Sequence, residues 1–306
     1  MKQNTEFKTL IASQIMANRP KLSESSLSSY VSTLANIPKK LEGENSIEFL
    51  EDNTDAILDF YKNTPVNKRK SVMSAIQVLT NKKNSKIETQ MLDDIKEYNN
   101  QNQEQKKTQS ESNNWIHWSD VVKIHTSLGE KALPLLKNKT KTILTGKEIE
   151  LLNQYILLSF FVYMPPRRSL DYAIMKIKNF GIEDNYITKN GEIVFNIYKT
   201  AKHYGKQSFQ LPPQLKLILI KWRKINNTDY LLVNPTKQNE NKPFNSVQIN
   251  RMFNQIFDKK ISVDILRHSY ITKFYSGLTP SQSEINDLSF KMAHSASQNM
   301  LYRRVE

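Results

Sequence analysis

The side chains that could do chemistry together stand far apart in this sequence. Arg168, Lys199 and Arg267 are cations, and His294 and Tyr302 follow them near the end of the chain. Each guanidinium offers a planar fork of donors that matches two phosphate oxygens and stays charged at any working pH. A phenol can attack phosphorus and hold the bond as a covalent phosphotyrosine. In this order, the five residues predict a phosphodiester that cations bind and a tyrosine cleaves.

The local sequence gives each cation a reason to be held in place. Negative charge develops on the phosphate oxygens during cleavage, so fixed positive charge lowers the barrier. Arg168 follows Pro165-Pro166 at the end of an apolar helix, and Arg267 is expected near a helix start, where backbone N–H groups favour anions. Lys199 is expected to end a hairpin strand, where it could protonate a leaving 5′-oxygen.

Each of these residues has a plain structural alternative when it is taken alone. A single arginine commonly forms a surface ion pair, and a tyrosine near a chain end commonly just packs. Lys202 and Lys206 compete with Lys199, and all three could be solvated lysines of a loop. Only the complete set favours catalysis over packing.

Composition limits the partners. The 306 residues suffice for about two domains and carry a formal net charge of +14. Residues 1–112 hold 16 Lys/Arg against 15 Asp/Glu, whereas residues 113–306 hold 28 against 15. A basic second half predicts a polyanion partner, with double-stranded DNA first, although a basic surface without a partner is the alternative.

Several classes of protein are excluded or disfavoured. The chain has no cysteine, so it has neither disulfides nor thiolate metal sites, and its seven glycines form no phosphate-binding loop. We expect no metal and no cofactor. Residues 1–8 are polar, and the apolar run Tyr155 to Met164 is too short to span a bilayer. We therefore expect an intracellular protein with no membrane contact, in the cytoplasm or nucleus of a host cell.

The first part of the chain predicts a small helical domain. Apolar residues recur at helical spacing in residues 22–41 and 46–61, and a third helix opens at Lys68-Arg69-Lys70. This basic triplet is the candidate phosphate contact of the domain, and a solvated helix start is equally expected. Residues 97–114 hold almost nothing that can be buried, which predicts a linker or, alternatively, a polar helical extension. The expected boundaries are 1–96, 97–114 and 115–306.

The second part predicts a larger domain that is mainly α with a small antiparallel β-sheet, an α+β fold. Asn190-Gly191 between two β-rich runs predicts a hairpin with a primed two-residue turn, and residues 207–211 predict a third strand. Helices are expected at 147–163, 213–225, 246–257, 264–276 and 281–292.

Three motifs, together with Lys199 and Tyr302, resemble those of the tyrosine recombinase (phage integrase) family over residues 115–305. They are Arg168-Ser169-Leu170-Asp171, Leu266-Arg267-His268-Ser269 and Ala293-His294-Ser295. The helical residues before them resemble the core-binding domain of that family. The Pro-Pro-Arg-Arg sequence and the Asn/Lys-rich composition resemble versions carried by large DNA viruses and their parasites.

The resemblance implies a site-specific recombinase or integrase that works through a 3′-phosphotyrosyl intermediate, without metal or ATP. It implies a tetramer on two DNA duplexes, each held between the two domains. Arg168 and Arg267 would clamp the phosphate, Lys199 would be the general acid, and His294 would be a second phosphate ligand. Tyr302 would be the nucleophile, and Asp171 would orient an arginine.

Asp264 and Ala293 are two of the departures from the family pattern. The family has His or Lys three residues before this arginine, where the chain has Asp264, an anion that opposes phosphate charge. We expect Asp264 to cap the helix that carries Arg267. His268 is not expected to replace the missing base, because adjacent helix positions face different directions. Ala293 stands where the family commonly has glycine.

Two other functions remain open at this stage. A catalytically decayed DNA-binding protein of the same fold would explain Asp264. A topoisomerase IB-like or telomere-resolving strand transferase would use the same residues in a different assembly.

Overall fold

The structure is a computed structural model that describes residues 2–137, 144–277 and 279–305. The chain divides after Glu104 into two compact units, unit 1 with residues 1–104 and unit 2 with residues 105–306. Unit 1 carries 14 Lys/Arg and 14 Asp/Glu, whereas unit 2 carries 30 and 16. The whole excess of positive charge therefore belongs to unit 2.

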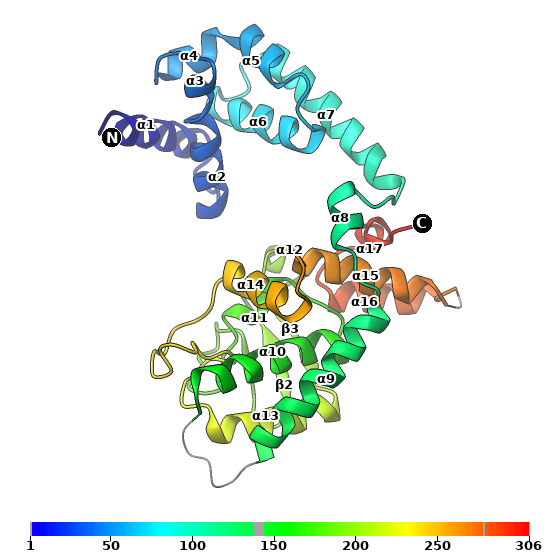
Figure 1. Ribbon diagram of the computed structural model, residues 1–306. Coiled ribbons are helices and arrows are strands. Elements are labelled where there is room, and N and C mark those ends of the chain that lie inside the picture. Colours follow the sequence, from blue (N-terminus) through cyan, green and yellow to red (C-terminus); the bar gives the residue numbers. More distant parts are fainter. Residues whose placement is uncertain (1, 138–143, 278, 306) are drawn as a thin grey trace. The chain divides into compact units, whose positions relative to one another are not determined.

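Unit 1 is built from helices that share one apolar core (Figure 1). They are α1 Lys2–Asn18, α2 Glu24–Leu34, α3 Ile37–Lys40, α4 Ile47–Asp52, α5 Thr54–Tyr61, α6 Val66–Leu79 and α7 Ser85–Gln103. Ser23, Ser46 and Asn84 are N-caps whose side chains accept a backbone N–H of the first turn. The regions expected as single helices at 22–41 and 46–61 are each two helices, because α2 ends at Leu34 before α3 begins at Ile37, and α4 ends at Asp52 before α5 begins at Thr54.

Unit 2 surrounds the buried helix α10 Gly146–Tyr163. The other helices are α8 Gln109–Asn114, α9 Trp118–Lys137, α11 Ser169–Ala173, α12 Ala201–Tyr204, α13 Pro213–Ile225, α14 Ser246–Phe257, α15 Val263–Tyr275, α16 Gln282–Lys291 and α17 Ala296–Tyr302. Every residue of α10 from 155 to 161 is buried, and α9, α13 and α14 pack against this helix. Thr145 and Glu148 form a capping box that fixes its start.

Residues 97–114, for which a linker was one expectation, are largely helical. Helix α7 continues to Gln103, and α8 begins after Thr108, which forms a capping box with Glu111. The helical alternative therefore holds, because Gln, Glu and Lys lose little free energy in a helix even without burial. The chain divides after Glu104, within residues 97–114 that the sequence placed between the two domains.

The sheet of unit 2 has three antiparallel strands in the order β1-β2-β3, and these are Tyr186–Ile187, Glu192–Phe195 and Gln207–Gln210. The expected primed two-residue turn between β1 and β2 is wrong. Thr188 accepts a hydrogen bond from the Gly191 N–H at 3.1 Å, and only Gly191 of this turn has positive φ, at 86°. This is a longer loop whose last residue needs the left-handed conformation that glycine adopts freely.

The predicted fold class, mainly α with a small antiparallel sheet, is confirmed. The predicted helices at 147–163, 213–225, 246–257, 264–276 and 281–292 lie within one residue of α10, α13, α14, α15 and α16 at each end. Within the residues that the structure describes, no helix is long and apolar enough to cross a membrane.

Candidate active site

Arg267 is the centre of the candidate site. It lies in α15, one turn after the N-cap Ser262, and its side chain is 0% exposed. Its Nη1 donates to the Tyr302 hydroxyl at 3.0 Å, and its Nη2 lies 3.2 Å from His294 Nδ1. The guanidinium also lies over the Tyr302 ring, 4.6 Å from the ring centroid. One arginine thus contacts both later members of the predicted set.

His294 follows α16 and is buried, and its contact with Arg267 fixes its tautomer. A guanidinium only donates, so Nδ1 accepts and the proton of the neutral ring sits on Nε2. Burial, and then the positive charges of Arg267, Arg168 and Arg167, lower the pKa of His294 to about 3. Nε2 is buried and has no hydrogen-bond partner among the described residues. His294 is therefore a neutral ring with one N–H donor still to be used.

Tyr302 ends α17, a short helix that packs against α15 and α16. Its ring stacks on His268, with centroids 4.5 Å apart and an interplanar angle of 24°. His268 Nδ1 lies 2.7 Å from the Tyr302 carbonyl oxygen. His268 therefore contacts the ring and the backbone carbonyl of Tyr302, while Arg267 contacts its hydroxyl.

Arg168 reaches the same region through the backbone of Ala293. Its Nη1 donates to the Ala293 carbonyl at 3.1 Å, and the Thr200 hydroxyl donates to the same oxygen at 2.9 Å. Ala293 has a φ of 55°, a left-handed conformation that costs a non-glycine residue about 1–2 kcal/mol. The carbonyl that joins Arg168 and Thr200 thus belongs to a residue with a strained backbone.

Lys199 precedes Thr200 and is exposed. It does not end a strand as expected, because β2 ends at Phe195 and Lys199 lies in the connection to β3. The Thr200 bond to Ala293 brings this connection beside Arg168. Lys202 and Lys206 are exposed in the same connection.

Arg167 is a buried residue that the sequence analysis did not single out. Its Nε donates to Asp171 Oδ2 at 2.8 Å, and its Nη1 bonds Gln207 Oε1 at 2.7 Å and the Lys291 carbonyl at 2.8 Å. Its guanidinium also lies 4.0 Å from the Phe195 ring centroid. Arg167 therefore connects strands β2 and β3 to the end of α16. Asp171 orients an arginine, as the resemblance implied, but this arginine is Arg167.

Asp264 is not the helix cap that the sequence suggested. The N-cap is Ser262, whose hydroxyl accepts from the Ile265 N–H, and Asp264 lies in the first turn. Its side chain is 70% exposed, and Oδ1 lies 3.5 Å from Arg267 Nη1. Asp264 thus stands at the solvent edge of the site, next to the nitrogen that contacts Tyr302.

The three basic residues Lys68, Arg69 and Lys70 of unit 1 have different surroundings. Arg69 donates to the buried carboxylate of Asp94 at 2.8 Å, and Lys70 lies 3.2 Å from the centroid of the Tyr98 ring. Lys68 has an exposed side chain. Because the Asp94 carboxylate already compensates the charge of Arg69, we do not expect Arg69 to contact phosphate.

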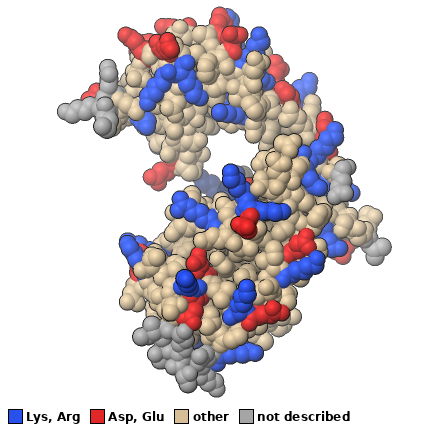
Figure 2. All heavy atoms as spheres, viewed as in Figure 1, with Lys and Arg blue, Asp and Glu red and all other residues tan. Residues whose placement is uncertain are grey.

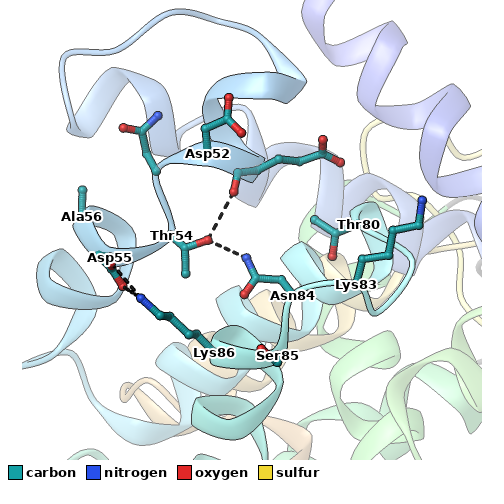
Figure 3. A pocket seen from close by; sticks show the side chains of 11 residues that line it. Asp52, Thr54, Asp55, Ala56, Thr80, Lys83, Asn84, Ser85 and Lys86 are labelled. Carbon is teal, nitrogen blue, oxygen red and sulfur yellow. Dashed lines mark hydrogen bonds and ion pairs between the residues drawn. The ribbon is translucent and has the colours of Figure 1, made fainter.

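Other features of the surface do not point to chemistry. Figure 2 shows basic side chains spread among acidic ones on the visible face. A pocket of about 650 Å³ in unit 1 is lined by residues 51–56, 80 and 83–86, and some of its polar groups bond one another (Figure 3). Lys86 pairs with Asp55 at 2.7 Å, and Asn84 donates to Thr54. Among the described residues, no group of three or more His, Asp or Glu side chains could share a metal ion.

The similarity of this chain to known proteins is structural and distant. No protein-family model matches the chain, and no curated protein matches its sequence. Among solved structures, the chain is similar to the crystal structure of XerA recombinase, with a TM-score of 0.42 and 10% sequence identity. The alignment covers 98% of this chain and 94% of that chain. A similarity of this degree decides neither family nor activity, so the functional conclusion rests on the geometry of the site.

Proposed function

We propose that this chain cleaves and rejoins DNA strands through a tyrosine nucleophile, as a site-specific recombinase or integrase. The observation that carries the proposal is the 3.0 Å hydrogen bond from Arg267 Nη1 to the Tyr302 hydroxyl, beside an N–H of His294 that has no partner among the described residues. A guanidinium that donates to a phenol oxygen stabilises negative charge there as the phenol loses its proton.

The proposed reaction exchanges one phosphodiester for another. The Tyr302 oxygen attacks phosphorus as its proton passes to solvent water, and the bond from phosphorus to the 5′-oxygen breaks. The product is a 3′-phosphotyrosyl link and a free 5′-hydroxyl, whose proton Lys199 supplies. Rejoining reverses these steps, and it needs no ATP because the covalent link conserves the bond.

Three groups would stabilise the phosphate oxygens in the transition state. Arg168 and Arg267 supply fixed positive charge, and the His294 Nε2–H supplies a neutral donor. The two arginines carry the positive charge that a metal ion brings in other phosphoryl-transfer sites. We therefore propose cleavage without metal.

Double-stranded DNA is the proposed partner. The net charge of +14 in unit 2 suits a polyanion, and Lys199, Lys202 and Lys206 expose ammonium groups in one connection next to Arg168. Exchange between two duplexes needs one tyrosine for each strand, so the proposal includes a tetramer on DNA.

The experiment is to trap the covalent complex. Wild-type protein is incubated in chelator with a plasmid that carries the DNA flanking its gene, and the reaction is stopped with detergent. We expect protein-linked DNA with wild type and with the control Tyr270→Phe, and none with Tyr302→Phe. If no reaction gives protein-linked DNA, the proposal fails and the chain is better described as a DNA-binding protein that does not cleave DNA. Linkage that appears only with magnesium would indicate a metal-dependent enzyme.

A further inference from the structure

Behind Tyr302 lies a buried arginine that the proposed chemistry does not use. Arg304 donates to Glu111 Oε1 from both Nε and Nη2, at 3.1 and 2.9 Å. Its Nη1 donates to the Leu301 carbonyl at 2.8 Å, and its backbone N–H donates to Thr272 Oγ1 at 2.9 Å. Arg304 therefore fixes the chain immediately after the tyrosine to both α15 and α8.

The same guanidinium sets the state of His268. Arg304 Nη2 lies 3.2 Å from His268 Nε2, so Nε2 accepts and the ring proton sits on Nδ1. Nδ1 can then donate to the Tyr302 carbonyl, 2.7 Å away. Burial, and then the charge of Arg304, lower the pKa of His268 to about 4, so the ring stays neutral. The Tyr302 carbonyl only accepts and the Arg304 guanidinium only donates, so both contacts select the same tautomer of His268.

Glu111 is itself held rigidly. Its Oε2 accepts the Thr108 N–H at 2.8 Å in the capping box of α8, which leaves Oε1 for Arg304. Burial raises the pKa of Glu111, but the hydrogen bonds from Arg304 and Thr108 outweigh it, so the pKa lies below its ordinary value. Glu111 is thus a fixed, ionised anchor.

Backbone contacts join the same two segments. Val305 N–H donates to the Gln105 carbonyl at 3.0 Å, and the Gln105 side chain donates to the Met300 carbonyl at 2.9 Å. Residues 105–111 therefore hold the chain on both sides of Tyr302.

We propose that Glu111 is a positioning residue for Tyr302, acting through Arg304 and His268. This inference rests on the proposed role of Tyr302 as nucleophile. Glu111 contacts none of the reacting atoms, but it determines where the backbone of the nucleophile lies. A displacement of about 1 Å in a reacting group can cost about a hundredfold in rate.

The test measures covalent-complex formation at saturating enzyme in a single turnover, with the plasmid described above. Glu111→Ala should slow this step about 10- to 100-fold while DNA affinity stays unchanged. Glu111→Gln should recover part of the rate, because its single amide oxygen can still accept from Arg304, although the amide NH2 then faces the Thr108 N–H and the capping box loses one bond. The double variant Glu111→Ala/Arg304→Ala should be no slower than Arg304→Ala, because both residues act along one path.

A matched control separates positioning from loss of a helix cap. Glu284 completes the capping box of α16 with Ser281, as Glu111 does for α8 with Thr108. Glu284→Ala should therefore cleave at the wild-type rate. If Glu111→Ala fails to fold, Glu111→Asp replaces it, since it keeps the charge but is too short to reach Arg304. A wild-type rate in the Glu111 variant, or an equal loss in Glu284→Ala, would overturn the inference.

A second readout is independent of activity. Arg304 is buried, so trypsin should cleave after it slowly in wild type and quickly in Glu111→Ala, as intact-mass spectrometry would show. If wild type forms no covalent complex, the proposed function fails, while the trypsin result still decides whether Glu111 holds the chain around Tyr302. Equal trypsin cleavage in wild type and Glu111→Ala contradicts the positioning role even if the protein is active.

Discussion

Each unit has an arginine in a buried hydrogen-bond network, but the two networks differ in whether a buried carboxylate compensates the charge of the arginine. In unit 1, Arg69 bonds the Asp94 carboxylate, which is 0% exposed, and also the Lys62 carbonyl. In unit 2, Arg267 is buried against His294 and Tyr302, and the carboxylate at 3.5 Å, that of Asp264, is mostly in solvent. The charge of Arg69 is matched inside the protein, and the charge of Arg267 is not.

Under the proposed function, this difference separates an arginine that stabilises the fold from one that binds an anion. A buried charge is costly unless a partner of opposite charge and further hydrogen bonds compensate it. Arg267 hydrogen-bonds the neutral Tyr302 hydroxyl and His294 ring, and Arg168 adds positive charge nearby. The carboxylates that act on Arg267 are the exposed Asp264 and Asp171, which bonds Arg167. A bound phosphate would compensate the positive charge of Arg168 and Arg267, whereas Asp94 already compensates the charge of Arg69.

The largest effect should come from the uncompensated arginines. Arg168→Ala and Arg267→Ala should each slow single-turnover cleavage about 10²–10³-fold, because each removes a fixed donor from the phosphate. DNA affinity should change much less. Arg251→Ala, in an exposed position of α14, is the control and should cleave at the wild-type rate. Unchanged cleavage in either arginine variant would remove that residue from the site.

Arg69→Ala should act on stability and leave chemistry intact. It leaves the Asp94 carboxylate buried without its partner, which costs about 3 kcal/mol or more. Chemical denaturation would measure the loss, and cleavage per folded molecule should not change. A large loss of DNA binding with no loss of stability would reverse our assignment and return Arg69 to the DNA-contacting surface.

Acid should destabilise unit 2 before unit 1. Burial lowers the pKa of His125 and His268 to about 4 and that of His294 to about 3, and unit 1 has no histidine. Between the ordinary histidine pKa of about 6.5 and the lowered pKa values in the folded state, these three histidines bind protons in the unfolded state but stay neutral in the folded state. The free energy of unfolding should therefore fall as pH falls from about 6.5 toward 4, by up to about 1.4 kcal/mol per pH unit per histidine.

Hydrogen exchange resolved by peptide would test this difference at pH 7, 6 and 5. Protection of the most stable peptides should decline in unit 2 and stay nearly constant in unit 1, after correction for the intrinsic exchange rates. Equal declines in both units would show that the buried histidines do not govern acid stability.

The smallest effects should come from the edge of the site. Asp264→Asn should keep cleavage near the wild-type rate and barely change the melting temperature, because Asp264 is exposed and is not the cap. Ser262→Ala removes the actual cap and should cost about 1 kcal/mol. Cleavage that is a hundredfold slower in Asp264→Asn, with normal folding, would make this carboxylate part of the reaction.

The sequence predicted α10, α13, α14, α15 and α16 well because each has ten or more residues with apolar side chains on the side that packs. It did not predict the short helices α11, α12 and α17. It also predicted the meeting of Arg267, His294 and Tyr302, since motifs of fixed spacing carry these residues. It placed Lys199 in a strand that ends four residues earlier, because β-rich composition does not mark where pairing stops.

Residues that act through distant partners escaped prediction. Glu111 and Arg304 are 193 positions apart, and neither local spacing nor hydrophobic pattern connects them. Arg167 stood in a visible arginine pair, but only its contacts with Asp171 and Gln207 distinguish it from Arg168. In both cases, burial of a charged side chain is the decisive signal, and a single sequence does not contain it.

The central claim is that Tyr302 becomes covalently linked to DNA. The most direct measurement isolates the protein–DNA complex formed in chelator, digests both components, and identifies the modified residue by tandem mass spectrometry. The account predicts a nucleotide 3′-phosphate on the Tyr302 oxygen. A nucleotide on Tyr270 or Tyr275, or a 5′-phosphate link, would contradict it.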